Sequence, residues 1–293
     1  MKVYIESKAQ PCPGVTNAIN KAEELLFKNK KVYLLGQLIH NQREIDRMKK
    51  IGLQQITREE LFCDSDQNIL SEKYFLIRSH GELEEVVQKA QEKNFIIVDA
   101  TCPIVQHSHK LITQHIQKGW KIVIVGNKKH QEVNALLAST KGNGTVLSSL
   151  EEIEKHNFDN KSVLLAQTTI DPDFFFQIRN KLLSRFNQFK AIDTTCRYLH
   201  KRKKQIKKFV SMMNIVILVG GKQSSNCKML YEYSLKHNKR SYKIEKTGDI
   251  NKKWFKKNDK VGITGGASTP RWQLNEVKSY IENNFTDKSP QKG

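Results

Sequence analysis

Three cysteines recur along the chain at almost equal intervals, and thiolates are metal ligands. Cys12 lies 90 residues before Cys102, which lies 94 residues before Cys196. Three converging thiolates suit an iron–sulfur cluster. A four-iron cluster normally takes four thiolates, so three would leave one iron open to bind an oxygen and act as a Lewis acid. Zinc with three thiolates and a water is the competing metal site.

Structural cysteines are the ordinary alternative, because isolated cysteines are often simply buried. Two observations argue against this alternative. Each of the three recurring cysteines stands where a strand-like segment is followed by a helix-like one, and the amides of a helix N-terminus favour thiolate over thiol. Cys63 and Cys227 do not recur in this way, and we leave both out of the cluster. Five cysteines without a CxxC pair also argue against a disulfide framework or a zinc ribbon.

A threefold internal repeat would position the three cysteines. Each cysteine is followed by a helix-like stretch and then an apolar strand, which ends 24 residues later in Gly36, Gly126 or Gly220. Four residues beyond these glycines stand His40, His130 and Ser224, and six beyond stand Gln42, Glu132 and Asn226. A second strand in each repeat also ends in polar residues, at 79–81, 167–169 and 264–268. Strands alternating with helices in this way predict α/β units with parallel strands.

We therefore predict an α/β fold of three pseudo-equivalent units. They span residues 13–101, 102–195 and 196–287, with the N-terminal strand 1–12 joining the third unit and a flexible tail at 288–293. Ligands of open α/β sheets bind at the carboxyl ends of the strands. A pseudo-threefold arrangement would thus direct all nine recurring positions at one central cavity.

Two glycine turns predict a phosphate site. Residues 220–226 and 265–270 each combine a strand end, glycines and hydroxyl side chains, and the first also supplies an amide where a helix opens. Such turns donate backbone and side-chain hydrogen bonds to phosphate, although many loops need glycine for geometry alone. His40 and His80, both at strand ends, would complete the shell of the anion.

Glu132 is the only acidic residue among the nine recurring positions, so it is the candidate acid. His130 lies two residues away in sequence, and Thr168 lies at the end of a neighbouring strand. These three side chains predict a proton relay.

The chain carries a net charge of +20, which fits an anionic substrate, an acidic protein, nucleic acid or a lysine-biased genome. The basic run at residues 200–208 is the candidate nucleic-acid surface, but it lacks interleaved aromatics and resembles a solvated helix face. No apolar run reaches the roughly 18 to 20 residues of a membrane helix, and no secretory or transit segment is evident. These patterns predict a cytoplasmic protein that binds no membrane and disfavour nucleic acid.

Five motifs together resemble the family of 4-hydroxy-3-methylbut-2-enyl diphosphate reductases, the LytB-type iron–sulfur enzymes of the non-mevalonate isoprenoid pathway. The motifs are residues 79–81, 99–103, 167–169, 222–226 and 266–270, in the order of that family. The resemblance covers about Lys2 to Ile281, nearly the whole chain.

This resemblance implies a trefoil arrangement of the three units around a central [4Fe–4S] cluster with three cysteine ligands and one open iron. It implies two-electron reductive dehydroxylation of (E)-4-hydroxy-3-methylbut-2-enyl diphosphate to isopentenyl and dimethylallyl diphosphates. Electrons would come from an acidic donor protein of the ferredoxin or flavodoxin type, docked by part of the positive charge.

The family's site residues match positions of this chain. Cluster ligands correspond to Cys12, Cys102 and Cys196, and proton delivery corresponds to Glu132 assisted by Thr168. Substrate contacts correspond to His40, His80, His130, Thr168, Ser224, Ser225, Asn226 and Ser268. The chain departs from the family where Gln10 and Pro11 replace a usual Gly-Phe, and where Lys129 and Gln131 replace the Gly and Pro that flank the histidine.

Two other functions remain as alternatives. An open iron also serves hydrolyases that dehydrate hydroxy acids, although no arginine clamp for a carboxylate is evident. A basic RNA- or DNA-binding protein is the alternative from a different class, and a salt titration of nucleic-acid binding would separate it from an enzyme.

Overall fold

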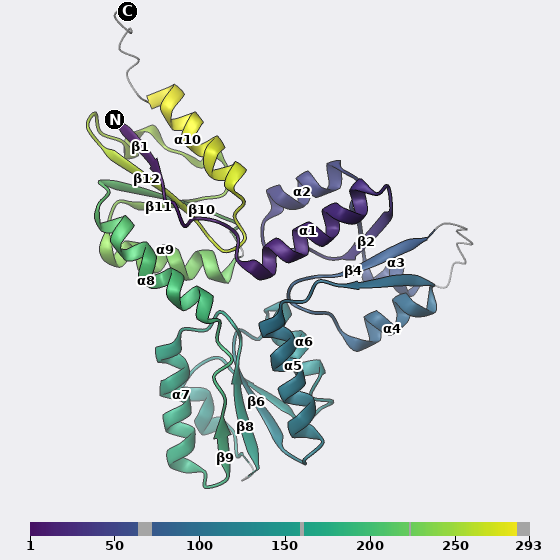
Figure 1. The fold of residues 1–293 in the computed structure, drawn as a ribbon. Helices are drawn as coiled ribbons and strands as arrows, with labels where there is room; N and C mark the ends of the chain where they lie inside the picture. The colour runs from purple at the N-terminus through teal and green to yellow at the C-terminus, as the bar shows by residue number, and fades with distance from the viewer. Residues whose placement is uncertain (64–71, 159–160, 223, 286–293) are drawn as a thin grey trace, which may run out of the picture. The chain divides into compact units, whose positions relative to one another are not determined.

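The computed structural model describes residues 1–63, 72–158, 161–222 and 224–285, and it is an α/β protein with three four-stranded parallel sheets (Figure 1). Sheet 1 contains β3 (Gln54–Ile56), β2 (Lys31–Leu35), β4 (Lys73–Ile77) and β5 (Phe95–Asp99), in that spatial order. Sheet 2 contains β7 (Gly144–Leu147), β6 (Lys121–Val125), β8 (Ser162–Ala166) and β9 (Phe189–Ala191). Sheet 3 contains β11 (Ser241–Ile244), β10 (Ile215–Val219), β12 (Lys260–Gly265) and β1 (Lys2–Ile5).

The three sheets share one topology, which confirms the predicted fold class of three equivalent α/β units. In each sheet the first two strands along the repeat pair with each other, the third pairs on the other side of the first, and the fourth completes the edge. In sheet 3 the N-terminal strand β1 occupies that fourth position, in parallel register with β12 from Lys2–Lys260 to Ile5–Ile263. In each sheet the fourth strand is followed by one of the three recurring cysteines, so the three cysteines occupy equivalent positions in the topology.

Helices connect the parallel strands, as parallel pairing requires. They are α1 (Pro13–Phe27), α2 (Gln42–Lys50), α3 (Arg58–Phe62), α4 (Glu84–Glu92), α5 (Pro103–Ile116), α6 (Gln131–Ala138), α7 (Pro172–Arg185), α8 (Arg197–Ser211), α9 (Ser225–His237) and α10 (Arg271–Phe285). Short 3₁₀ turns lie at Glu151–Lys155, Thr247–Asp249 and Lys252–Trp254. Within the described residues, no helix is long and apolar enough to cross a membrane.

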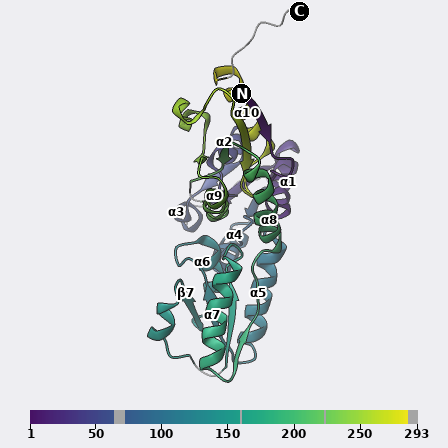
Figure 2. The same ribbon diagram turned by 90° about the vertical axis from the view of Figure 1, so that its left-hand side faces the viewer.

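Apolar side chains on alternate strand positions cover both faces of the sheets. In sheet 2, Val123 and Leu164 pack with Phe175 of α7, whereas Ile122 and Val163 on the other face pack with α5 and α6. Figures 1 and 2 show these helices on the two sides of sheet 2. In sheet 3, the same alternation packs α10 against one face and α8 with α9 against the other. Strands buried on both faces leave only their ends for polar chemistry.

The chain forms two compact units. Unit 1 contains Met1–Thr16, Ile39–Arg47 and the chain from Arg197 onward, and therefore holds sheet 3. Unit 2 contains Asn17–Leu38 and Met48–Cys196, and holds sheets 1 and 2. The predicted boundaries of the three repeats stay a prediction, and the predicted tail at 288–293 lies outside the described residues.

Candidate functional site

Cys12, Cys102 and Cys196 occupy the same local position in their sheets. Each directly precedes the first residue of a helix, which is α1, α5 or α8. The backbone N–H of each donates to a carbonyl just beyond the end of an adjacent strand, with N–O distances of 2.9 Å for Cys12 to Ala267, 3.0 Å for Cys102 to Ser79 and 2.8 Å for Cys196 to Thr168. The repeat in the sequence thus appears as a repeated backbone contact.

An aspartate shapes the turn before two of these cysteines. The Asp99 carboxylate accepts the N–H of Thr101 at 2.8 Å, and the Asp193 carboxylate accepts the N–H of Thr195 at 2.9 Å. Such Asx turns fix the backbone locally. The segment before Cys12 contains no aspartate, so a different contact must fix its path.

The three cysteines fit a thiolate-bound metal group by their chemistry. They are partly exposed, and none of the chain's five cysteines, all in its described part, is in a disulfide. Each lies at a helix N-terminus, where the helix dipole stabilises an anionic ligand. Unit 1 holds Cys12 and unit 2 holds the other two. No three His, Cys, Asp or Glu side chains of the described residues form a metal-binding group, so the assignment rests on donor chemistry and shared position.

The other two cysteines lie in different settings. Cys63 is exposed at the C-terminal end of α3. Cys227 is fully buried, and desolvation raises the pKa of its thiol. A Cβ at Gly266 would lie 2.1 Å from the Cys227 sulfur, so this thiol fills space beneath the loop that carries Ser268. Its contacts indicate a packing role.

Unit 2 brings the predicted acid and its partner together. Glu132 is 1% exposed, and its two carboxylate oxygens accept the N–H of Thr168 at 2.6 Å and its hydroxyl at 2.8 Å. Burial raises the pKa of Glu132 from 4.5 to about 7, because desolvation outweighs the two bonds from Thr168, which lower it. A carboxyl with such a pKa is partly protonated near neutral pH and is suited to donate a proton.

The same unit places two histidines beside each other. His130 caps α6, and its Nδ1 accepts the N–H of Glu132 at 3.2 Å, so the neutral ring carries its proton on Nε2. The ring centroids of His130 and His80 lie 5.8 Å apart in an edge-to-face arrangement. His80 follows Ser79, which binds the Cys102 amide, and Thr168 binds the Cys196 amide. Unit 2 therefore gathers two candidate ligands, two histidines and the candidate acid.

Unit 1 gathers the predicted phosphate donors at the start of α9. Ser224 caps the helix and accepts the N–H of Cys227 at 3.3 Å, and Ser225 is the first helical residue. Asn226 is 6% exposed, and neither atom of its amide has a hydrogen-bond partner among the described residues. Because an unpartnered buried amide is costly, Asn226 is poised for a polar ligand.

His40 and Ser268 lie beside this helix start within unit 1. The Ser268 hydroxyl donates to the His40 carbonyl at 3.3 Å, and a Cβ at Gly221 would lie 2.5 Å from that same oxygen. Glycine is thus required at Gly221 by the close approach of two loops. Together these contacts place His40, Ser268 and the first turn of α9 around one edge of sheet 3.

Asn41 supports this group, and the sequence repeat did not identify it. Its amide donates to the Ser268 carbonyl at 2.8 Å and exchanges hydrogen bonds with the Gln273 amide at 3.0 and 2.9 Å. Its oxygen also accepts the N–H of Glu44 at 3.1 Å, in the manner of a helix N-cap. Asn followed three residues later by Glu is the local signal that indicates this cap. Gln42, which the repeat singles out, is instead exposed and bonds Asp46.

Comparison with known proteins gives consistent matches along the whole chain. A family model described as LytB protein matches residues 3–282. The 4-hydroxy-3-methylbut-2-enyl diphosphate reductase of Bacteroides thetaiotaomicron is 36% identical, covering 96% of this chain and 98% of its own. The enzyme of the same name from Aquifex aeolicus is 34% identical, covering 96% of each chain.

Two solved structures share the fold. A structure of (E)-4-hydroxy-3-methyl-but-2-enyl diphosphate reductase, named as the terminal enzyme of the non-mevalonate pathway, superposes with a TM-score of 0.71 at 33% identity, covering 97% of this chain and all of that one. The E-1-hydroxy-2-methyl-but-2-enyl-4-diphosphate reductase of Plasmodium falciparum superposes with a TM-score of 0.84, covering 97% of this chain and 88% of that one. At 24% identity, the second likeness concerns the fold alone.

Proposed function

The chain belongs to the LytB protein family, and we propose that it reduces (E)-4-hydroxy-3-methylbut-2-enyl diphosphate to isopentenyl and dimethylallyl diphosphates. This is an oxidoreductase reaction on a diphosphate substrate, in which two electrons and two protons are taken up and the hydroxyl leaves as water. One arrangement carries the proposal: Thr168 binds the Cys196 amide through its carbonyl and binds Glu132 through its amide and hydroxyl. A candidate ligand and a candidate acid thus share one residue.

Membership of the family implies an iron–sulfur cofactor. We infer that it is a [4Fe–4S] cluster held by Cys12, Cys102 and Cys196, because these three share a helix-start position and Cys63 and Cys227 do not. When bound, such a cluster supplies electrons and a Lewis-acidic iron without a protein ligand.

The polar side chains of the two units are the proposed substrate contacts. Asn226 is the buried donor for the diphosphate, and the first turn of α9 adds backbone N–H groups at the positive end of its dipole. The full set of proposed substrate contacts is His40, His80, His130, Thr168, Ser224, Ser225, Asn226 and Ser268. These residues bind and orient the substrate and exclude water.

Glu132 holds the proton that the leaving hydroxyl requires. Its raised pKa keeps the carboxyl protonated in a sizeable fraction of molecules near pH 7. The Thr168 hydroxyl bonds one carboxyl oxygen and can pass the proton onward, while His130 offers an Nε2 proton beside His80. This relay is the one the sequence predicts, and its catalytic role is part of the proposal.

Anaerobic turnover tests the proposed function. Reconstituted protein is incubated with the substrate and dithionite, and both products are quantified by mass spectrometry. We expect both diphosphates to appear at a rate proportional to the iron content. A loaded protein that leaves the substrate intact, or that dehydrates hydroxy acids instead, would contradict the proposal.

Replacing Asn226 by Ala should weaken substrate binding. A hydrogen bond to a charged group contributes about 1.5 to 3 kcal/mol, so KM should rise roughly 10- to 100-fold with the cluster unchanged. Asn238 at the other end of α9 is the matched control, because its amide bonds the Val210 and Met213 carbonyls. Asn238→Ala should lower thermal stability and leave KM unchanged. Equal KM values for both variants would remove Asn226 from the site.

An acidic electron-donor protein of the ferredoxin or flavodoxin type is the proposed partner. Helix α8 begins directly after Cys196 and contains no acidic residue. Its exposed lysines, which we call the α8 lysine face, are Lys201, Lys204, Lys207 and Lys208. A positive face on the helix that follows a cluster ligand suits an acidic donor, because opposite charges speed encounter.

Salt should therefore slow turnover with the protein donor far more than turnover with dithionite, since the Debye length is about 8 Å at physiological ionic strength. Lys204→Glu combined with Lys207→Glu should lower the donor-dependent kcat/KM roughly 10-fold or more. The matched control is Lys256→Glu combined with Lys257→Glu, two exposed lysines just before the amino end of β12. If both double variants slow equally, only the overall charge matters, and the α8 lysine face is not the docking surface.

A further inference from the structure

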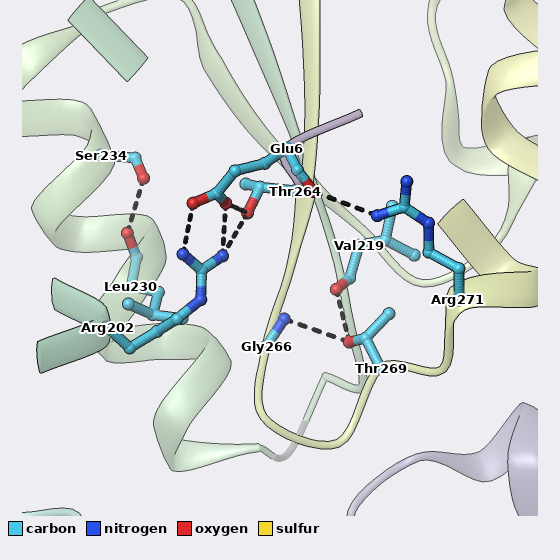
Figure 3. Close-up of polar contacts among 9 residues, drawn as sticks. All are labelled: Glu6, Arg202, Val219, Leu230, Ser234, Thr264, Gly266, Thr269 and Arg271. Atoms are coloured by element: carbon cyan, nitrogen blue, oxygen red, sulfur yellow. Dashed lines mark hydrogen bonds and ion pairs between the residues drawn. The ribbon is translucent and has the colours of Figure 1, made fainter. Parts of the chain in front are cut away.

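A buried ion pair joins the end of β1 to helix α8. Glu6 is 5% exposed and Arg202 is 3% exposed, and both guanidinium Nη atoms donate to the two Glu6 carboxylate oxygens. The Thr264 hydroxyl donates to Glu6 at 2.6 Å and accepts from Arg202 at 2.9 Å, which closes the network (Figure 3). Arg202 is thus the one residue of its basic run, 200–208, that is both cationic and buried.

The backbone of Glu6 is fixed as firmly as its side chain. Its N–H donates to the Ile263 carbonyl at 2.9 Å. Its carbonyl accepts the N–H of Ala9 and the Arg271 guanidinium, both at 3.1 Å. Figure 3 shows the Glu6 carboxylate facing Arg202 and its carbonyl facing Arg271. Glu6 therefore connects β1, β12, α8 and the start of α10.

These connections border two candidate cluster ligands. Glu6 lies six residues before Cys12, and Arg202 lies six residues after Cys196. Asx turns from Asp99 and Asp193 shape the segments before Cys102 and Cys196. The segment before Cys12 instead starts at the contacts of Glu6, packs Ala9 into the core and ends at the bond from the Cys12 amide to Ala267. A buried ion pair is weak evidence for stability, because apolar side chains of similar volume often serve as well. We therefore consider what the pair positions.

We propose that Glu6 is a positioning residue for Cys12: held by Arg202 and Thr264, it fixes the loop from Glu6 to Cys12 relative to the helix that follows Cys196. This rests on the proposed function, which makes both cysteines cluster ligands. Residues that orient metal ligands without touching the metal typically change metal retention by roughly 10- to 100-fold. In this role Glu6 acts through Arg202, Thr264 and the Cys12 loop and not by direct contact with the cluster or the substrate.

The experiment measures cluster release from anaerobically reconstituted holoenzyme. An iron chelator is added, and the loss of visible absorbance is followed at a temperature where circular dichroism shows every variant folded. Glu6→Gln should release the cluster roughly 10- to 100-fold faster than the parent. Thr264→Val removes only the bridging hydroxyl, and this variant should also release the cluster faster than the parent. It keeps the test available if Glu6→Gln does not fold.

The matched control is a second ion pair in the same sheet, in which the carboxylate is buried and the Arg240 side chain is 30% exposed. Asp259 is 5% exposed and accepts two bonds from Arg240 at 2.9 and 2.6 Å, but it lies at the amino end of β12, away from the Cys12 loop. Asp259→Asn should lower the melting temperature and release the cluster at the parental rate. Release rates that follow melting temperature in all variants, Asp259→Asn included, would overturn the proposal.

A double variant separates position from charge. Glu6→Gln with Arg202→Met removes the uncompensated buried cation and should recover melting temperature, yet the cluster should still leave quickly. If the double variant recovered both the parental melting temperature and the parental rate of cluster release, the proposal would be overturned, because the pair would then be merely structural. If the parent binds the cluster and the Glu6 variants release it at the parental rate, this proposal alone is overturned. A parent that takes up no iron or sulfide overturns the proposed function, and this proposal with it.

Discussion

Glu132→Gln should turn over roughly 10²- to 10⁴-fold more slowly than the parent while keeping its cluster and its substrate affinity, because general acid catalysis contributes about that much. Glutamine is nearly isosteric, and its amide oxygen can accept the Thr168 N–H while its NH₂ donates to the Thr168 hydroxyl, but it cannot deliver a proton. The measurement is kcat under anaerobic conditions with dithionite, normalised to iron content.

Glu152→Gln is the matched control for this variant. Glu152 accepts a backbone N–H, from Ser148 at 2.8 Å, as Glu132 does from Thr168, but its side chain is 22% exposed and paired with Lys128. We expect it to turn over at the parental rate. A Glu132→Gln protein that ran within a few-fold of the parent would require another proton source.

The pH dependence of stability tests the buried state of Glu132 without any turnover. Its pKa is raised from 4.5 to about 7 in the folded chain, so the folded state holds a proton that the unfolded state has released between these values. Stability should therefore fall as pH rises from about 4.5 to about 7, by up to roughly 3 kcal/mol, and the loss should persist above that range. Glu132→Gln lacks this penalty, so its melting temperature should gain on that of the parent between about pH 5 and pH 8. A constant difference across this range would indicate that Glu132 titrates normally.

The repeat in the sequence predicted the fold because it is local information repeated three times. The equal spacing from cysteine to glycine reflects helices and strands of nearly equal length in the three repeats, and the three sheets share one strand order. The pairing of β1 with β12 fills the fourth position of sheet 3, and it joins residues more than 250 positions apart in the sequence.

The site was predictable only where its residues stand in the repeat. Glu132 lies in the first turn of α6, which follows β6, and Thr168 lies just after the neighbouring strand β8. The sequence pointed to both residues, and the structure places them in direct contact. Glu6 and Arg202 have no repeat and no local pattern, and 196 residues separate them. Arg202 is hidden in a run of lysines that resembles a solvated face, since only tertiary packing distinguishes the one buried cation. The catalytic and binding roles of all these residues stay predictions.

Cys102→Ser should lose most of its iron, sulfide and visible absorbance and should turn over only at background. Serine keeps the size of the side chain and its place before α5, but its oxygen is a poor substitute for a thiolate in an iron–sulfur cluster. Cys12→Ser and Cys196→Ser should behave alike, because the three positions are equivalent.

Cys63→Ser is the control, since Cys63 is exposed at the end of α3 and stands outside the repeat. It should keep the parental iron content. A complete cluster in Cys102→Ser, together with parental turnover, would remove Cys102 from the ligand set.

Iron and acid-labile sulfide analysis of the anaerobically reconstituted parent tests the central claim most directly. One cluster held jointly by Cys12, Cys102 and Cys196 requires about four iron and four sulfide per chain. Stoichiometric zinc with no sulfide, or a chain that retains neither iron nor sulfide after reconstitution, would contradict it.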